Sequence, residues 1–451
     1  MSMDDLLARQ KKRSNTRSRR STIPSEVPEN APRKENRRKT SGTMSTTSSA
    51  NTTGRNSVIR KPTSRTSLPS IKTVLGSPDP SILAGMYALV GFGLVMVYSA
   101  SSIYADRTLH DANALIRTQA MHALLACTAA WIIGHYGDYR WLRRFTYPML
   151  IVTLLLLIAT ISGMGHAAGG AARWIRIGGL FRVQPAEIAK LTVICWLADS
   201  LAKKREQIRS FSVGFLPHAL GAATFMLLCL KQPDFGSAVM IGLLLFVMLF
   251  AAGARLGYLL GLGMLCLPIV YVAVAGSEYR MRRIAAFFSQ ADNYQLWESQ
   301  LSFGAGGIFG VGLGGSRQKL MYLPEAHTDF ISSIVGEELG LIGLTLLVLA
   351  YMFLIYRGIR TALRVPDEYG SLLCVGVSLF IGMQAFTNLA VAVGVLPTKG
   401  LVLPFISFGG SSLIVNCCAV SLMSNVSRLQ SAEKVTPPAA SAETRPLGGV
   451  S

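Results

Sequence analysis

The stretch Tyr322-Leu-Pro-Glu-Ala-His-Thr-Asp-Phe330 runs directly into the apolar segment 331–356. This join carries one histidine and four carboxylates, the latter on Glu325, Asp329, Glu337 and Glu338. The pattern predicts a hydrophobic helix with these groups at its mouth. A carboxylate at membrane depth costs about 3 kcal/mol and is usually functional. We therefore expect the rest of the chain to hold this cluster at a membrane face.

The composition argues against a soluble domain. Of the 451 residues, 50% are hydrophobic and only 15% are charged, whereas soluble domains carry about 25% charged residues. Ten apolar runs approach the length needed to cross the ~30 Å hydrocarbon core of a bilayer, and they lie at residues 82–101, 118–136, 147–163, 186–201, 212–230, 236–252, 257–275, 331–356, 371–394 and 410–427. The sequence thus predicts an all-α polytopic membrane protein with about ten transmembrane helices.

The loop between the seventh and eighth predicted spans, residues 276–330, is the longest and is expected to be extracytoplasmic. Loops beyond about 15 residues inside a compact fold are usually functional or disordered. This one contains the glycine-rich apolar segment 304–315, which is typical of a short re-entrant or interfacial piece. Nucleotide binding is rejected, because the glycines neither follow a strand nor have the context of a nucleotide motif.

The ends of the chain differ in composition from its middle. Residues 1–80 hold seventeen of the 44 Lys and Arg and six of the 24 Asp and Glu, a net charge of +11 among Ser, Thr, Asn and Pro. Such a segment cannot bury a core, so residues 1–80 and 431–451 are predicted to be disordered cytoplasmic tails around a membrane domain at 81–430. The basic tail is expected to anchor topology and contact anionic lipid. No nucleic-acid partner is predicted, because aromatic residues are not interleaved with the basic ones.

Two further features fit a membrane protein. All seven cysteines fall inside the apolar runs, where they behave as small hydrophobic residues and not as a disulfide framework or metal site. No cleavable signal peptide is expected, because the N-terminus is polar and the first apolar run begins near residue 82.

The loop charges predict an orientation and an anionic ligand. Without the tail, one set of loops carries fourteen Lys and Arg and the other carries twelve. The first set has the dense clusters that flank span ends and shares its side with the basic tail, so both termini are predicted to be cytoplasmic. Twelve cations on the outer loops are more than we expect of a surface that binds no ligand, and they indicate an anionic ligand there.

Two outer segments have unusual composition. Residues 163–185 combine glycines with Arg173, Trp174 and Arg176, which offer a stacking surface and guanidinium forks for an anion. An interfacial belt of Trp and Arg explains the same residues equally well. This alternative stays open at the level of sequence.

Residues 395–412 break an apolar run with Pro397, Pro404 and several glycines, and carry Lys399 between the two prolines. Irregular backbone at membrane depth is tolerated where it lines a cavity or is covered by protein. A plain loop with two proline stops is the alternative, and the lysine between the prolines disfavours it.

Several long motifs resemble the SEDS family (shape, elongation, division, sporulation). The resemblance covers about residues 80–430, and within the family it is strongest to the division and sporulation members. The motifs are Lys319-Leu-Met-Tyr-Leu-Pro-Glu-Ala-His-Thr-Asp-Phe330, Gly336-Glu-Glu-Leu-Gly340, Gln184-Pro-Ala-Glu-Ile-Ala-Lys190, Gln232-Pro-Asp-Phe-Gly236, Leu396-Pro-Thr-Lys-Gly-Leu401 and Pro404-Phe-Ile-Ser-Phe-Gly-Gly-Ser411.

The resemblance implies a glycosyltransferase in the bacterial inner membrane at the division septum. It implies polymerisation of lipid II into peptidoglycan glycan strands with release of undecaprenyl pyrophosphate. It also implies a class B penicillin-binding transpeptidase and other division proteins as partners. Small departures from the family pattern at Glu298, Gly315 and Phe408 put family roles for Glu298 and Phe408 in doubt but leave Asp329 unaffected.

Asp329 is the candidate general base, a role that the resemblance assigns to it. Joining a sugar hydroxyl to a lipid-linked sugar requires removal of the hydroxyl proton and stabilisation of the departing pyrophosphate. The alternative is that Thr328 or Asp329 merely caps the following helix. For His327, orientation of Asp329 and simple packing are both left open.

Other residues are candidate contacts of the substrate. The candidate ligands of the pyrophosphate groups and of lipid II are Arg173, Arg176, Glu187, Lys190, Lys231, Lys319, His327, Lys399 and Ser411. Each cation alone is also explained as an interfacial snorkel. Glu187 and Lys190, three residues apart on one helix, have the spacing to neutralise each other.

A divalent cation, Mg²⁺ or Mn²⁺, bridging Asp329 and the pyrophosphate is a further expectation, since such ions neutralise leaving-group charge. No set of ligands in the sequence defines a metal site. Two rival functions stay open. A lipid II flippase would use Glu187, Lys190 and Asp199 along a polar path, and a non-catalytic division scaffold would depend on the basic tail.

Overall fold

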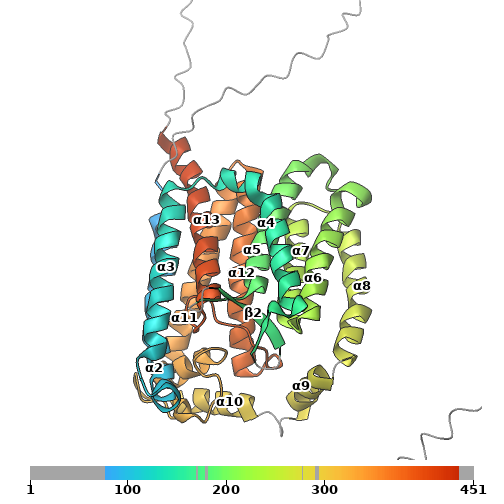
Figure 1. The fold of residues 1–451 in the computed structure, drawn as a ribbon. Coiled ribbons are helices and arrows are strands. Elements are labelled where there is room, and N and C mark those ends of the chain that lie inside the picture. The colour runs from blue at the N-terminus through green and yellow to red at the C-terminus, as the bar shows by residue number, and fades with distance from the viewer. Residues whose placement is uncertain (1–76, 169–170, 178–180, 277, 290–293, 436–451) are drawn as a thin grey trace, which may run out of the picture. The chain divides into compact units, whose positions relative to one another are not determined.

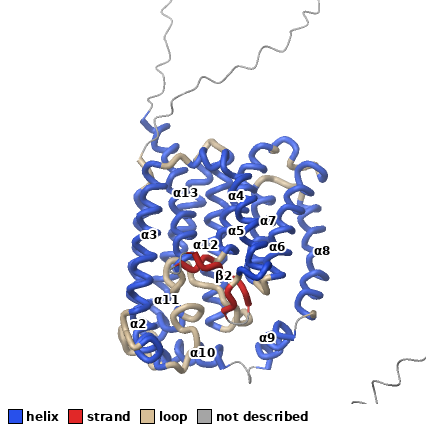
Figure 2. Tube along the Cα trace, in the orientation of Figure 1, coloured by secondary structure: helices blue, strands red, loops and turns tan. Residues whose placement is uncertain are grey.

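The computed structural model describes residues 77–168, 171–177, 181–276, 278–289 and 294–435. The expectations for residues 1–76 and 436–451 lie outside the described residues. Figures 1 and 2 show helices packed side by side. The helices are α2 (Pro80–Leu109), α3 (Ala114–Tyr136), α4 (Tyr139–Ala159), α5 (Pro185–Lys203), α6 (Leu216–Lys231), α7 (Phe235–Ala251), α8 (Leu256–Ala275), α9 (Glu278–Ser289), α10 (Tyr294–Gly306), α11 (Ile331–Arg364), α12 (Glu368–Val393) and α13 (Gly410–Val435).

Each of the ten predicted spans falls on a helix. By length and apolar composition, six stretches of the described chain are able to cross a membrane: Pro80–Leu109, Tyr139–Gly163, Phe211–Lys231, Ile331–Arg364, Glu368–Val393 and Gly410–Leu429. Phe235–Ala251 and Leu256–Val272 are shorter apolar helices. The count of ten crossings therefore stays a prediction. The helix α13 continues to Val435, and the domain boundary at residue 430 stays a prediction.

The helices differ in how far they are enclosed. α12 packs against α5, α7, α11 and α13, and most of its side chains are buried. α5 is similarly enclosed, because it contacts α4, α6, α7 and α12. At the edge of the bundle, α8 is largely exposed, and Leu259 is buried within it. The chain therefore has a well-packed interior around α5 and α12 and a weakly packed margin at α8.

The prediction of a purely helical fold was wrong in one place. The segment before α5 forms a small antiparallel sheet in the order β1 (His166–Ala168), β2 (Ala171–Ile177) and β3 (Phe181–Val183). In β2 and β3, Arg176 is paired with Arg182 and Ile175 with Val183. The run from Arg173 to Ile177 is rich in aromatic and β-branched residues, Trp174, Ile175 and Ile177, which favour a strand. The sheet lies toward the same end of the bundle as α9 and α10 (Figures 1 and 2).

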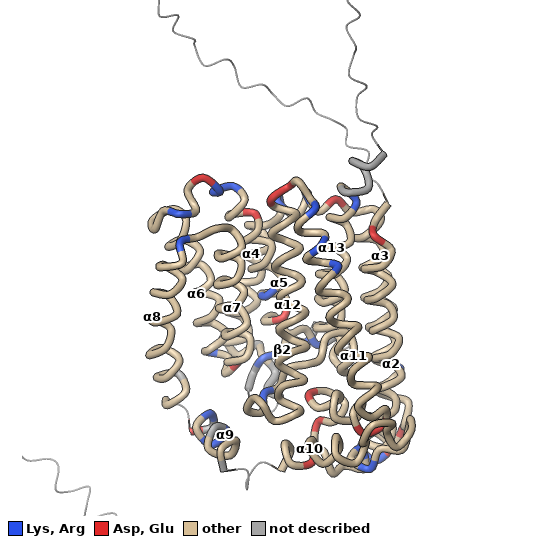
Figure 3. Tube along the Cα trace, turned by 180° about the vertical axis from the view of Figure 1, so that it is seen from behind, with Lys and Arg blue, Asp and Glu red and all other residues tan. Residues whose placement is uncertain are grey.

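Charged residues gather mostly at the two ends of the helices, with tan residues between them (Figure 3). The end away from α9 and α10 is tied together by Asn425 of α13. The side-chain oxygen of this asparagine accepts from the Tyr139 amide at 3.0 Å, and its NH₂ group donates to the carbonyls of Ile133 and Gly137 at 2.8 and 2.7 Å. One buried amide thus satisfies the main-chain groups where α3 ends and α4 begins.

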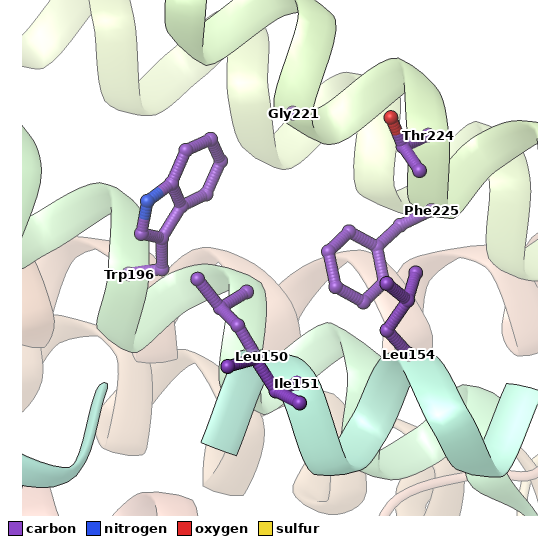
Figure 4. A pocket seen from close by; sticks show the side chains of 7 residues that line it. All are labelled: Leu150, Ile151, Leu154, Trp196, Gly221, Thr224 and Phe225. Carbon is purple, nitrogen blue, oxygen red and sulfur yellow. The ribbon is translucent and has the colours of Figure 1, made fainter. Parts of the chain in front are cut away.

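An apolar cavity of about 220 Å³ lies between α4, α5 and α6. Figure 4 shows Trp196 and Phe225 on opposite sides of it, with leucine and isoleucine side chains between. A Cβ atom on Gly221 would lie 2.4 Å from the indole of Trp196, so this glycine makes room for the ring. The cavity has no charged lining residue, which separates it from the polar end of the molecule.

The glycine-rich segment after α10 docks onto a break in α11. The break is at Gly340, whose φ of 65° and ψ of −165° are not helical. Main-chain groups exposed by the break are paired by the segment, because the amides of Val311 and Gly312 donate to the carbonyls of Glu337 and Glu338 at 3.0 Å each. The expected re-entrant piece is therefore a main-chain plug for a discontinuous helix.

The plug needs glycine at position 310 for two reasons. Gly310 has a φ of 82°, and a Cβ atom there would lie 2.2 Å from the Glu338 carbonyl oxygen. We expect Gly310→Ala to destabilise the protein by about 3 kcal/mol or more, from left-handed strain plus overpacking. Gly312→Ala is the matched control, because Gly312 has a φ of 92° but open space around it. Thermal unfolding in detergent measures both, and equal losses would contradict the proposed collision.

Candidate active site

The turn before α11 presents Asp329. Its amide and that of Thr328 both donate to the Glu325 carbonyl at 3.1 Å, and Glu325 has a φ of 56°. The residue at the N-cap position of α11 is Phe330, and no side chain caps the helix. The alternative in which Thr328 or Asp329 caps the helix was therefore wrong. The Asp329 carboxylate lies beside the start of α11 and does not cap the helix.

A second segment reaches the same place. Residues 395–409 run as irregular backbone between α12 and α13, and a Cβ atom on Gly400 would lie 3.2 Å from Asp329 Oδ2. The buried Asn388 of α12 bonds both segments: its NH₂ group donates to the Asp329 carbonyl at 2.8 Å and to the Leu401 carbonyl at 2.7 Å. Residues far apart in sequence thus meet at the carboxylate.

The 395–409 segment is held along its whole length. Arg283 of α9 donates to the Thr398 carbonyl at 2.9 Å. Gln119 of α3 donates to the Ser407 carbonyl at 3.2 Å and accepts from the Gly409 amide at 3.3 Å. These contacts fit irregular backbone that is covered by protein, and they disfavour a plain surface loop.

Lys399 lies on this segment beside the start of α7. Its ammonium group is 5.2 Å from the centre of the Phe235 ring, and the guanidinium of Arg280 is 5.7 Å from the same ring. Burial lowers the pKa of Lys399, and the neighbouring Asp234 carboxylate opposes that change. Asp234 caps α7 through the Ser237 amide at 3.1 Å. A partly desolvated cation thus stands next to the Asp329 region.

Arg173 extends the cation cluster from the small sheet. Its guanidinium donates to the carbonyls of Gln232 and Pro233, the former at 3.4 Å. Arg173 and Arg283 both act on the Asp329 carboxylate and lower its pKa. Burial is the larger effect, and together with the charge of Glu325 it raises the pKa of Asp329 to about 7. This carboxyl group is therefore poised to exchange a proton near neutral pH.

Two of the candidate substrate ligands lie elsewhere in ion pairs. Lys190 is fully buried, with its ammonium group 2.6 Å from Glu187 Oε1 and 5.5 Å from the Phe380 ring centre. Gln384 donates to the other Glu187 oxygen at 3.3 Å. The sequence spacing of Glu187 and Lys190 thus corresponds to mutual neutralisation. The structure does not bring their charges to Asp329.

Lys319 also lies apart from Asp329. Its ammonium group is 3.3 Å from Glu338 Oε1 and donates to the Gly314 carbonyl at 2.6 Å. Ser99 of α2 donates to both oxygens of Glu338 at 2.7 and 2.8 Å. Glu337 accepts from the Arg317 amide at 2.9 Å. This second cluster fixes the glycine plug against α11.

The remaining candidates differ in their exposure and in their contacts. Arg176 and Lys231 are exposed. Ser411 is buried, and its hydroxyl accepts from the Gln184 amide at 3.3 Å. The His327 ring packs 5.0 Å from Tyr104 and 5.8 Å from the ring of Phe408, measured between centroids. Packing is therefore the role that the geometry supports for His327, and burial lowers the pKa of this imidazole.

A protein-family model described as a cell cycle protein, which groups FtsW, RodA and SpoVE, matches residues 80–432. The chain belongs to this SEDS family. The resemblance drawn from the motifs is thereby confirmed.

Known SEDS proteins match most of the chain. A probable peptidoglycan glycosyltransferase FtsW of Geobacter metallireducens is 47% identical over 77% of this chain and 94% of its own length. Stage V sporulation protein E of Bacillus subtilis is 40% identical over 78% of this chain and 97% of its own. A solved peptidoglycan synthase complex, reported as coordinating polymerisation and crosslinking, contains a chain that is 29% identical with a TM-score of 0.65, over 78% of this chain and 98% of that one.

Sequence reasoning missed two contributors to this SEDS site. Arg283 was counted only as one of many outer cations, although the alternation of basic and apolar residues in Glu278–Ser289 marks an amphipathic helix. Asn388 went unnoticed as one of a few polar residues inside an apolar run. Polar side chains in transmembrane segments usually bond to another segment, and that signal was available.

The expected divalent cation shared between Asp329 and the pyrophosphate stays a prediction. Among the described residues, no three or more His, Cys, Asp or Glu side chains are grouped to hold a metal ion. Mg²⁺ is usually held by one or two carboxylates together with substrate phosphates, and Asp329 and Glu325 are near enough to interact electrostatically.

The raised pKa of Asp329 makes folding pH-dependent. A carboxyl with a folded pKa of about 7 and an ordinary unfolded pKa near 4 stabilises the folded state below both values, and this stabilisation is lost as pH rises through about 7. In Asp329→Asn the side chain cannot ionise, so the variant does not lose stability in this way as the pH rises. The variant should therefore be more stable than the parent at pH 8, by up to about 4 kcal/mol, with the difference shrinking toward pH 4.

Thermal unfolding at pH 5 and pH 8 in one detergent measures this difference. Asp234→Asn is the control, because the Asp234 carboxylate is bonded by the Ser237 amide and hydroxyl and stands near Lys399. It should give no gain at pH 8. A gap between Asp329→Asn and the parent that did not depend on pH would refute the shifted titration.

Proposed function

We propose that the chain polymerises lipid II into glycan strands, with Asp329 as general base. The chain is a peptidoglycan glycosyltransferase, as its relatives at 47% and 45% identity over 77% of its length are named. One observation carries the choice of base. The Asp329 carboxylate is packed against Gly400, is influenced by two arginines and titrates near neutral pH.

The reaction forms one bond and breaks one. The acceptor hydroxyl oxygen attacks the anomeric carbon of the donor sugar, and the bond from that carbon to the pyrophosphate oxygen breaks. The hydroxyl proton passes to the Asp329 carboxylate, and undecaprenyl pyrophosphate leaves with the electron pair. A base with a pKa near 7 is matched to this task, because it is ionised at working pH yet still basic.

Cations around Asp329 would stabilise the leaving pyrophosphate. Arg173 and Arg283 place positive charge near the carboxylate, and Lys399 lies on the 395–409 segment next to Gly400, beside the Phe235 ring. Preorganised charge of this kind contributes most where water is excluded. Exposed Arg176 and Lys231 are suited to the first capture of the anionic substrate, and Ser411 to a hydroxyl contact. Lys190 and Lys319 have structural roles in this proposal, because their charges are spent in buried ion pairs.

Mg²⁺ or Mn²⁺ would supply further neutralisation of the pyrophosphate when bound. Asp329 is the residue that would hold such an ion with the substrate, and the protein's own cations would act beside it.

The partner and location follow the same reasoning. The solved relative is part of a complex that couples polymerisation to crosslinking, which supports a class B penicillin-binding transpeptidase as partner here. FtsW-named relatives support action at the division septum of the bacterial inner membrane, with other division proteins. Both termini are proposed to be cytoplasmic, so that Asp329 faces outward.

A flippase is the weaker alternative. It would need charges along a polar path, but Glu187 is neutralised by Lys190, and Asp199 lies 3.0 Å from Arg143 and 2.6 Å from Lys203. Paired charges offer little to a passing substrate. The scaffold alternative rests on the basic tail, which lies outside the described residues.

The base assignment predicts loss of polymerisation in Asp329→Ala. Purified protein with its transpeptidase partner should convert lipid II into glycan strands, and the variant should lose at least about 100-fold in rate. In the parent, the rate should rise as pH increases through about 7, because the ionised carboxylate is the active form. A variant that is folded, by its unfolding transition, and polymerises normally would disprove the assignment.

The leaving-group assignment predicts a loss for Lys399→Ala and for Arg173→Ala. Removing one stabilising donor costs about 100-fold in rate at comparable sites. Arg364→Ala is the control, since Arg364 is exposed at the opposite end of α11 from Asp329 and should retain the parental rate. Initial rates of lipid II polymerisation give the comparison. Parental rates in both site variants would mean that other groups hold the pyrophosphate.

A further inference from the structure

Asn388 is a buried polar side chain near the C-terminal end of α12, with 2% of its surface exposed. Both the NH₂ group and the oxygen of its side chain are hydrogen-bonded. The NH₂ group donates to the Asp329 carbonyl at 2.8 Å and to the Leu401 carbonyl at 2.7 Å. The side-chain oxygen accepts from the Ser332 hydroxyl of α11 at 3.0 Å. One amide therefore joins the turn before α11, the 395–409 segment and α11 itself.

We infer that Asn388 is a positioning residue for glycan transfer, which sets the separation between the Asp329 carboxylate and the Lys399 segment. This inference rests on the proposed function, in which Asp329 removes a proton and Lys399 stabilises the leaving pyrophosphate. Asn388 touches neither sugar nor pyrophosphate in this role. It acts through two main-chain carbonyls: that of Asp329, which carries the carboxylate, and that of Leu401, two residues after Lys399.

The geometry leaves little freedom between the two segments. Gly400 is so near Asp329 that a Cβ atom would lie 3.2 Å from the carboxylate oxygen. The bonded carbonyls belong to Asp329 itself and to Leu401, next to Gly400 and two residues after Lys399. A movement of either carbonyl therefore changes the distance from the base to the cation. A misplacement of about 1 Å costs about 100-fold in rate at a preorganised site.

The chemistry of the side chain restricts the choice to asparagine. Two carbonyl oxygens need two N–H donors from one short side chain, and a carboxylate of the same shape has none. Ser332 selects the orientation, because its hydroxyl donates to the amide oxygen and so turns the NH₂ group toward the carbonyls. The support is rigid, since α12 is packed against five other helices, α5, α7, α10, α11 and α13. Sites held by such a second layer of contacts keep their geometry.

Asn425 provides a matched control within the same chain. It is also buried, with 1% of its surface exposed, and its NH₂ group donates to two main-chain carbonyls at 2.8 and 2.7 Å. These belong to Ile133 and Gly137, at the far end of α3 from Gln119. About 14 helical residues separate Ile133 from Gln119, or about 21 Å. Loss of Asn425 thus reproduces the cost of an unpaired buried carbonyl away from the site.

The experiment compares Asn388→Asp and Asn388→Ala with Asn425→Asp and Asn425→Ala in the complex with the transpeptidase partner. Lipid II polymerisation is followed over a range of lipid II concentrations, and thermal unfolding is measured for each variant. We expect both kinds of asparagine variant to lose similar stability. Only the Asn388 variants should lose kcat, by about 100-fold, with KM changed by less than about threefold, because positioning acts on the chemical step.

Ser332→Ala is a milder variant for the case in which the Asn388 variants do not fold. It keeps both N–H donors but removes the hydroxyl that orients them, so kcat should fall by about tenfold. Parental kcat in Ser332→Ala, or equal kcat in the Asn388 and Asn425 variants, would overturn the inference. Asp329→Ala is assayed alongside. If that variant is active, the proposed function fails instead, so the two failures are distinguishable.

Discussion

The structure depends on the cost of leaving main-chain polar groups unpaired where water is scarce. An unbonded carbonyl or amide in hydrocarbon costs several kcal/mol, so irregular backbone survives there only when other protein groups satisfy it. Three amide side chains meet this need: Asn388 and Gln119 around the 395–409 segment, and Asn425 where α3 passes into α4. The glycine plug meets it with main chain alone at the Gly340 break. Non-helical backbone in this protein is therefore found where a specific partner satisfies it.

The same scarcity of water separates structural charges from functional ones. Lys190 and Lys319 each lie within 3.3 Å of a carboxylate, and both pairs are almost fully buried. A buried charge without its partner would be strongly unfavourable, so these pairs hold helices and loops in register. The described structure gives Asp329 no ion pair within 4 Å and only longer-range help from Arg173 and Arg283. Burial therefore raises the pKa of this carboxyl group, and a carboxylate with a raised pKa suits the proposed role of general base.

Sequence was sufficient for the membrane class, the helical segments and the Asp329 motif, because apolar runs and long motifs are local signals. It failed where the signal is tertiary. The cations Lys319 and Lys399 look alike in sequence, yet one is paired with Glu338, 19 residues away, and the other faces Phe235. The sheet around Arg173 was missed because its strands are only three to seven residues long. The sequence marks Asn388 only as a polar residue inside an apolar run, and it does not name its three partners, Ser332, Asp329 and Leu401, which belong to other segments.

The two halves of the site have unequal support. Asp329 and Asn388 rest on α11 and α12, which pack against each other and, through α12, against the enclosed α5. Arg283 instead belongs to α9, which follows the largely exposed α8 and reaches the site through the Thr398 carbonyl. Few buried contacts mean low local stability, so Asp329 is fixed more firmly than Arg283. Such a difference suits the proposed function, in which the Asp329 carboxylate stays in place while the residues around it admit and release a long lipid-linked chain. The side-chain amide of Asn388 joins the two parts of the site, because it holds the 395–409 segment, which carries Lys399, to the firmly packed α12 and to Asp329.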